Sequence, residues 1–380
     1  MHRVDNLWEP MLSDENLDGS LFDVNKNHHW RTHHRPNYCT AWVEEHLPER
    51  KAELRQIIED GFVQKSPKVT QRYDPNAQKW RTVSEPIQWP DQYVHHALIR
   101  VLQPVMMRGM DKYCSGSIKG RGTHYGKAAI ERWMKNDPKG TRYCMTLDIR
   151  HFYQSLKPEV VMDRMRQLVK DRRVLDLIWR VVKDGILIGA YTSQWFANTT
   201  LQPLDHLIRE GGYGVAHYIR YMDNFTIFGP NKRKLRKLRA VIEKWLNDHS
   251  LQLKDDWQIF PTDKRKPDAV GYRYGRGYTI PRKHTLLRIK RAVARYRKRR
   301  AKHKSVFAGT AAGLISRLGI LRHCNNHRLY QMIYRGEKLL RQLKNIVRAK
   351  SRKELTTWST FMALRARSKS SRPKVAVTPT

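Results

Sequence analysis

The segment HYIRYMDNFTIFG, residues 217–229, predicts two short strands that meet at an acidic turn. Its flanks are rich in β-branched and aromatic residues, which suit strands. Met222, Asp223 and Asn224 lie between the flanks, and Asp and Asn tolerate turn geometry well. A carboxylate at the tip of such a hairpin is held by two apolar strands and can be presented to a metal ion without moving.

A second carboxylate lies upstream in YCMTLDIRHFYQSL, residues 143–156. Apolar residues alternate there with Thr146 and Asp148, which is the period-two pattern of a strand. Asp148 is therefore expected at the end of that strand. Two strands that deliver Asp148 and Asp223 to one edge of a sheet would form a two-metal site for phosphoryl transfer.

These two segments resemble motifs A and C of reverse transcriptases, and three further segments resemble motifs of that family in the expected order. GILIGAYTSQWFANTTLQPLDHLI (185–208) resembles motif B, SGSIKGRGTHYGKAAIERW (115–133) the fingers motif, and EPIQWPDQYVHHALIRVLQPV (85–105) the motif before it. The resemblance is colinear over about residues 80–285. In motif B, the order Ile188, Gly189, three residues, Ser193, Gln194 is similar to the enzymes of diversity-generating retroelements, which copy RNA with errors at adenines.

The resemblance implies an α+β right-hand polymerase fold, with fingers, a palm built on an antiparallel sheet, and a basic helical thumb. The implied domains are an N-terminal extension and helix (1–75), fingers (76–145), palm with part of the fingers (146–281), thumb (282–350) and a basic tail (351–380) that we expect to be disordered. The patterns predict helices over 41–64, 91–102, 127–135, 158–170, 172–184, 195–210 and 231–249, and strands over 79–83, 251–260 and 269–274. Residues 1–40 are expected to be irregular, 65–75 to be a polar connector, and a short strand is expected between Gly185 and Gly189.

The resemblance also implies the catalytic groups. Asp148 and Asp223 are expected to be catalytic and to bind two Mg²⁺ ions, or Mn²⁺ instead, together with the backbone carbonyl of Ile149. Asn224 stands where the family usually has a second Asp. It is expected to assist, but it keeps an oxygen ligand while losing a charge, so the metal should bind more weakly.

Substrate-binding roles follow from the same resemblance. Lys119 and Arg121 lie in a glycine-rich loop whose backbone and cations suit phosphate, although an ordinary glycine-rich turn is the alternative. Tyr153 is expected beneath the sugar of the incoming nucleotide, where its ring excludes a 2′-hydroxyl. At least one of Phe152 and Tyr153 is expected in the core, because adjacent strand residues face opposite ways, and the alternative is that both are core; it is the family spacing that assigns the sugar contact to Tyr153. The other expected contacts are Ile188, Gly189 and Gln194 with the nucleotide, Gly271 and Tyr272 with the primer, and Arg288, Lys290, Arg291, Arg295, Arg297 and Lys298 with the nucleic-acid backbone.

The charge of the chain indicates a polyanionic partner. Lys and Arg number 74 against 35 Asp and Glu, a net charge of +39. From Pro281 onward only Glu337 and Glu354 are acidic, while the basic residues of 288–304 are dense enough to bind phosphates in a salt-dependent manner. A solvated helix face is the alternative interpretation of that run.

Other features exclude some classes of protein. The four cysteines show no C-x-x-C spacing, which argues against a structural zinc and a disulfide framework. The histidines of HHWRTHH (28–34) fit no familiar ligand set, so we expect a surface segment. No apolar run approaches the ~20 residues of a membrane span, and the N-terminus lacks a signal-peptide core. A cytoplasmic protein of a prokaryotic cell or phage, without a membrane partner, is expected.

The sequence therefore predicts an RNA-directed DNA polymerase that makes cDNA from template RNA, a DNA or RNA primer and deoxynucleotides. A retroelement enzyme of this kind would also be expected to use a basic accessory protein. Two alternatives stay open: a phage-defence or retron-like reverse transcriptase, and an RNA-binding protein on a decayed polymerase fold, suggested by Asn224. No nuclease or integrase segment is identified in the sequence.

Overall fold

A computed structural model describes residues 2–31, 36–74, 79–302, 305–325, 327–334 and 339–349. The chain divides into two compact units, Met1–Val270 and Gly271–Thr380, and each is described by itself. The expected disordered tail (351–380), together with His33 and His34 of the histidine-rich segment, lies outside the described residues.

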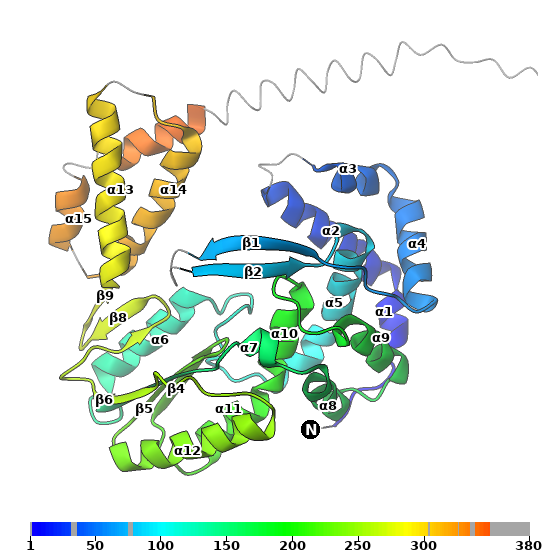
Figure 1. The fold of residues 1–380 in the computed structure, drawn as a ribbon, viewed down its shortest axis with the longest axis horizontal. Coiled ribbons are helices and arrows are strands. Elements are labelled where there is room, and N and C mark those ends of the chain that lie inside the picture. The colour runs from blue at the N-terminus through cyan, green and yellow to red at the C-terminus, as the bar shows by residue number, and fades with distance from the viewer. Residues whose placement is uncertain are drawn as a thin grey trace, which may run out of the picture. The chain divides into compact units, whose positions relative to one another are not determined.

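The centre of the first unit is a four-stranded antiparallel sheet in the order β4-β5-β3-β6 (Figure 1). The strands are β3 (Tyr143–Asp148), β4 (His217–Tyr221), β5 (Asn224–Gly229) and β6 (Gln258–Pro261). The predicted hairpin and the predicted strand ending at Asp148 are both present. The strand predicted over 251–260 is reduced to β6, and the last strand of the unit is the short β7 (Asp268–Ala269).

Helices cover both faces of this sheet. On one face lies α6 (Thr123–Asn136), whose Trp133 stacks on His217 with ring centroids 4.9 Å apart. On the other lie α11 (Gln202–Glu210) and α12 (Lys232–Asp248), which run together beneath the strands in Figure 1. The helix predicted over 231–249 is α12, and it buries one apolar face, as expected for an amphipathic helix: Leu235, Leu238, Ile242 and Leu246.

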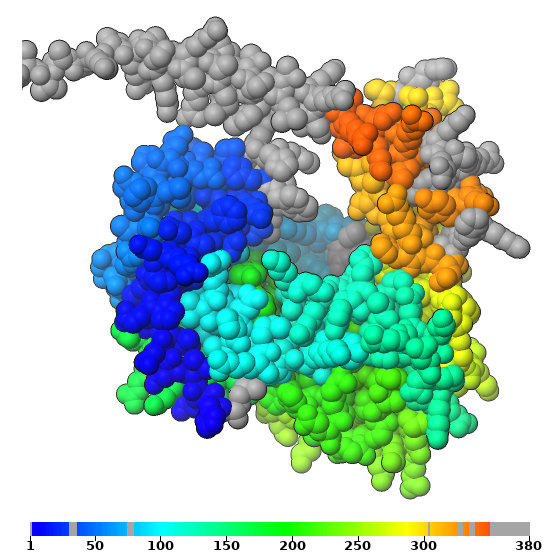
Figure 2. All heavy atoms as spheres, turned by 180° about the vertical axis from the view of Figure 1, so that it is seen from behind, coloured from blue at the N-terminus to red at the C-terminus, as the bar shows by residue number. Residues whose placement is uncertain are grey.

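The N-terminal region is helical, so the prediction that residues 1–40 are irregular was wrong. It contains α1 (Trp8–Leu12) and α2 (Asp14–Arg31), and α2 packs on α5 (Tyr93–Met107), beside which it lies in Figure 2. The apolar residues of α2 are few and its composition is polar, so its helicity depends on tertiary packing rather than on a strong sequence signal.

The helix predicted over 41–64 is two helices, α3 (Tyr38–Glu45) and α4 (Leu47–Glu59), which are broken at His46. The expected connector 65–75 instead contains β1 (Lys68–Asp74), which pairs with β2 (Lys79–Glu85) as an antiparallel hairpin. A kinked turn, η1 (Gln88–Gln92), in which Trp89 has the extended angles φ −109° and ψ 127°, then leads into α5.

The segment between β3 and β4 is helical. It comprises α7 (Phe152–Ser155), α8 (Pro158–Leu168), α9 (Arg172–Val182), α10 (Tyr191–Thr200) and α11. The single helix predicted over 195–210 breaks at Leu201, just before Pro203, whose ring prevents α10 from continuing. The strand expected between Gly185 and Gly189 is absent from the described structure, which has turns and irregular chain there.

The second unit is a small hairpin followed by helices. β8 (Tyr272–Gly275) and β9 (Tyr278–Pro281) precede α13 (Lys283–Ala301), α14 (Ala308–Gly319), η2 (Ile320–His323) and α15 (His327–Tyr334), and residues 339–349 are also helical. Their apolar residues form a separate core that includes Ile289, Leu314 and Leu343. Within the described ranges, none of the helices is both long and apolar enough for a membrane span.

Candidate active site

The turn between β4 and β5 places Asp223 beside the end of β3. Met222 has a positive φ of 57°, which lets the chain reverse between the two strands. The Ile149 amide donates a hydrogen bond to the Asp223 carbonyl at 3.2 Å, and Asp148 is paired with Asn224 in the sheet. Asp148, Ile149 and Asp223 are therefore brought together at one edge of the sheet, as the sequence predicted.

Both carboxylates lie in an environment that disfavours their charge. Burial raises the pKa of Asp148, an effect that Lys254 opposes and the nearby Asp223 reinforces. Burial likewise raises the pKa of Asp223, although its own backbone amide, Lys254 and Asn224 oppose the shift. Two buried carboxylates, of which Asp223 raises the proton affinity of Asp148, have an electrostatic reason to take up a cation.

Lys254 is joined to Asp148 in two ways. Its amide donates to the Asp148 carbonyl at 2.9 Å, and its Nζ forms an ion pair with Asp148 Oδ1. The sequence pattern does not connect Lys254 with Asp148, because the contact spans more than one hundred residues. Its side chain is 38% exposed, so the ammonium group is accessible from solvent.

The residues present suit a hard divalent cation. Asp148 Oδ1 is buried and its partner within the described residues is Lys254 Nζ, but a carboxylate oxygen has more than one acceptor site and can take a further ligand. Mg²⁺ typically takes one or two protein carboxylates and completes its shell with water and substrate phosphates. A protein-only cage is not formed, since within the described chain no three His, Cys, Asp or Glu side chains gather as a metal site.

Asn224 acts on its neighbour. Its Nδ2 donates to Asp223 Oδ1 at 3.1 Å, and the residue itself is exposed at the start of β5. The side chain therefore orients the Asp223 carboxylate in this structure. Whether its amide oxygen also binds a metal remains a prediction.

Tyr153 lies near Asp223, but the reasoning from strand geometry was wrong. Phe152 and Tyr153 are the first residues of the short helix α7, because the chain turns through a left-handed His151 after β3. Phe152 is buried in the core and Tyr153 is half-buried. Burial raises the pKa of the Tyr153 hydroxyl well above its usual value, and the charge of Asp223 adds to the effect.

The glycine-rich loop lies against the same hairpin. The Ser115 amide donates to the Arg220 carbonyl at 2.9 Å, and an added Cβ on Gly116 would lie 2.8 Å from the Met222 backbone nitrogen. Lys119 is exposed, whereas Arg121 is half-buried and donates to the Asp111 carbonyl at 3.0 Å. The loop thus keeps one cation open to solvent and uses the other partly for its own structure.

The expected nucleotide contacts from motif B are divided between two places. The Ile188 carbonyl accepts a hydrogen bond from the Ser84 amide at 2.8 Å, and Gly189, with φ of 121°, lies against Val83 and Glu85 of β2. Gln194 is half-buried in α10. Ser193 is buried inside α10, whose N-cap residue is Ala190, so Ser193 does not cap the helix.

The structure adds three buried polar residues that sequence reasoning missed: Asn198, Asp205 and Arg220. Their signal was present but weak. Asp205 interrupts the apolar positions Leu201, Leu204 and Ile208 of a buried helix face, and Arg220 stands inside a strand of apolar and aromatic residues. A charge at a core position requires a partner of opposite charge.

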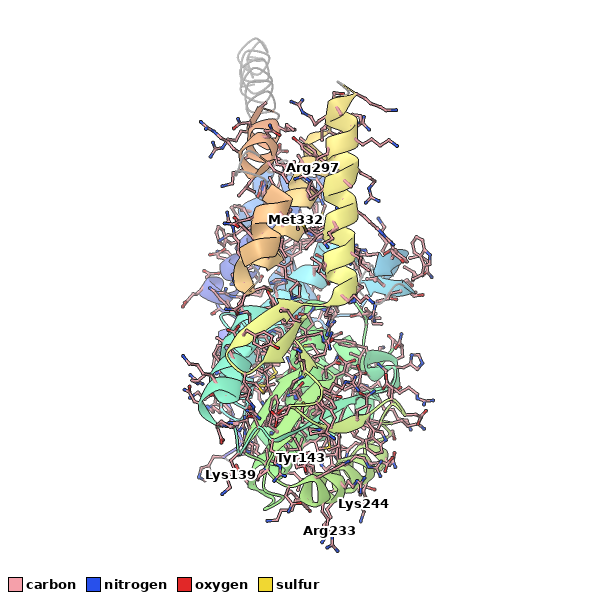
Figure 3. All side chains as sticks on the ribbon, turned by 90° about the vertical axis from the view of Figure 1, so that its left-hand side faces the viewer. Lys139, Tyr143, Arg233, Lys244, Arg297 and Met332 are labelled. Carbon is pink, nitrogen blue, oxygen red and sulfur yellow. The ribbon has the colours of Figure 1, made fainter. Side chains whose placement is uncertain are left out.

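The remaining predicted residues belong to the second unit. Gly271 has φ of 91° and Tyr272 is buried. On α13, Arg288 is half-buried, and four further basic residues are exposed: Lys290, Arg291, Arg295 and Lys298. Arg297 is also exposed but donates to the Ile333 carbonyl of α15, beside Met332 in Figure 3. Their roles in binding nucleic acid remain predictions.

Comparisons with known proteins bear on the first unit. Residues 65–266 match the family model described as reverse transcriptase (RNA-dependent DNA polymerase). No curated protein matches the chain. Among solved structures, the chain is similar to apo telomerase from Candida tropicalis, with 10% sequence identity and a TM-score of 0.39, over 60% of this chain and 52% of that one. The chain thus matches about half the length of that structure.

Proposed function

Because this chain belongs to the reverse transcriptase family, whose model matches more than half of its length, we propose that it is an active RNA-directed DNA polymerase. Its fold is the right-hand polymerase fold, in which the sheet β4-β5-β3-β6 forms the palm. The observation that carries the proposal is the meeting of Asp148 and Asp223 at one edge of this sheet.

Asp148, Asp223 and the Ile149 carbonyl would hold the divalent ions in this proposal. When bound, such ions activate the primer hydroxyl and neutralise charge on the departing pyrophosphate. The protein's part is mostly placement: the hydrogen bond from Ile149 fixes the turn, and Asn224 orients the Asp223 carboxylate. Lys119 would bind the triphosphate, and Tyr153 would limit the space at the sugar.

Lys254 would serve as the proton donor to pyrophosphate. Its Nζ is already at the site through the ion pair with Asp148, and it is open to solvent. Uptake of a cation by Asp148 would compete for that ion pair and free the ammonium group to face the phosphates.

We further propose that copying is error-prone at template adenines. Support comes from the segment Ile188–Gln194, which is similar to that of diversity-generating retroelement enzymes. Ile188 replaces a usual glutamine and so removes a polar side chain from base selection. Loss of a hydrogen-bonding group from a pocket lowers the discrimination that the pocket can provide.

The test is incorporation of deoxynucleotides on a primed RNA template, first with Mg²⁺ and then with Mn²⁺. Asp223→Ala should abolish extension. Asp255→Ala is the matched control, because Asp255 is a 91% exposed carboxylate that pairs with Arg150 and should leave extension unchanged. No extension by the unsubstituted chain with either metal, beside tight and salt-sensitive RNA binding, would refute the polymerase proposal. Accurate copying at adenines would refute only the error-prone part.

A further inference from the structure

Arg220 is a fully buried charge behind the catalytic hairpin. It points to the face of the sheet covered by α11, where its guanidinium forms two parallel bonds with Asp205, at 2.8 Å from Nε and 2.6 Å from Nη2. Both side chains have no exposed surface. Burial alone would lower the pKa of Arg220, but the Asp205 carboxylate raises it well above its usual value.

A buried ion pair of this kind gives little stability compared with apolar residues of the same size. The other hydrogen bonds of Arg220 therefore indicate what its buried charge is used for. Arg220 Nη1 donates to the Met222 carbonyl at 3.0 Å and to Asn198 Oδ1 at 2.8 Å. Met222 immediately precedes Asp223. The guanidinium therefore holds the turn from the face covered by α11, through the carbonyl of Met222, two residues after Arg220 in the chain.

Asn198 carries this connection to the glycine-rich loop. Its Nδ2 donates to the Gly116 carbonyl at 2.9 Å, and its backbone carbonyl accepts from Arg220 Nη2 at 3.2 Å. The loop also contacts the hairpin directly, through the hydrogen bond from the Ser115 amide to the Arg220 carbonyl and through the close approach of Gly116 to Met222. Every polar group in this chain of bonds is buried, so water cannot readily substitute for a lost partner.

We infer that Arg220 is a positioning residue that locks the Asp223 turn and the glycine-rich loop into one rigid unit through Met222, Asn198 and Gly116. A planar fork of five donors can satisfy all of these acceptors at once, which a lysine cannot. The inference rests on the proposed function only for the roles of the two segments, because the rigidity itself does not require turnover.

Amide hydrogen exchange tests it without any metal or substrate. The Ile149 amide reports on the turn, since it donates to the Asp223 carbonyl, and the Ser115 amide reports on the loop. Arg220→Lys keeps the charge but loses the fork. Tyr218→Phe is the matched control: it removes the hydroxyl bond to the same Asp205, in the same strand, without touching the turn.

Arg220→Lys should accelerate exchange at both amides by about tenfold or more, while Tyr218→Phe should leave both near their original rates even where it lowers the melting temperature. Unchanged exchange in Arg220→Lys, or equal acceleration in both variants, would overturn the inference. If Arg220→Lys does not fold, Asn198→Ala replaces it; there the Ser115 amide should exchange faster, and unchanged exchange would overturn the inference.

The same variants in primer extension separate the inference from the proposed function. Arg220→Lys should raise both the Mg²⁺ requirement and the deoxynucleotide KM about tenfold, whereas Tyr218→Phe should change neither. An inactive unsubstituted chain would refute the polymerase proposal, and the exchange rates would still decide the role of Arg220.

Discussion

Substitution of Gly116 by alanine should displace the catalytic turn. A Cβ there would lie 2.8 Å from the Met222 backbone nitrogen, whereas ordinary contacts begin at 3.4 Å. The Met222 side chain can swing away, but its backbone cannot, so loop and turn must separate by about 0.6 Å. Overpacking of this kind costs about 1–3 kcal/mol, and a misplacement approaching 1 Å at an active site lowers the rate on the order of 10–100-fold.

The same loop provides the control. Gly122 is the N-cap residue of α6, with φ of −83° and no neighbour within 4 Å of an added Cβ, so Gly122→Ala should cost only about 1 kcal/mol of helix capping and leave the rate unchanged. Urea denaturation gives the free energy of unfolding, and single-nucleotide incorporation gives the rate. Equal stability and equal rates for the two alanine variants would show that the loop does not constrain the turn.

Three further predictions concern pH, metal and salt. Burial raises the pKa of Asp91 to about 6 from 3.8, so the stability that protonated Asp91 contributes is full below about pH 4 and is lost as the pH rises through 6. Over that range the free energy of unfolding should fall by about 3 kcal/mol relative to the Asp91→Asn variant. Parallel pH profiles of the two proteins would contradict this prediction. Asn224→Asp adds a carboxylate and should lower the Mg²⁺ concentration for half-maximal extension about tenfold; an unchanged Mg²⁺ requirement would show that position 224 does not affect metal binding. Replacing Arg291, Arg295 and Lys298 with Gln should lower the slope of log K against log salt for RNA by about 1 per lost phosphate contact. The control replaces three exposed basic residues of α12 and should leave that slope unchanged: Arg233, Lys237 and Lys244. Arg233 and Lys244 project outward in Figure 3.

The sequence by itself determined the elements whose signals are local. Strands β3, β4 and β5 follow from alternation and turn residues within single segments, and α8, α9 and α12 follow from helical periodicity. Asp148 and Asp223 could be assigned to one sheet edge because each stands at the end of its own predicted strand. The ordered motifs then indicated the family.

Only the tertiary structure decided the contacts between segments far apart in the chain. The helicity of residues 14–31 depends on packing against α5, because their own pattern is weak. Lys254 meets Asp148 only because the chain before β6 crosses the end of β3. The partners of Arg220 come from α10, α11 and the turn, and no local pattern encodes such a set. Periodicity reports which face of an element is buried, whereas the identity of what lies against that face is settled only when the elements pack.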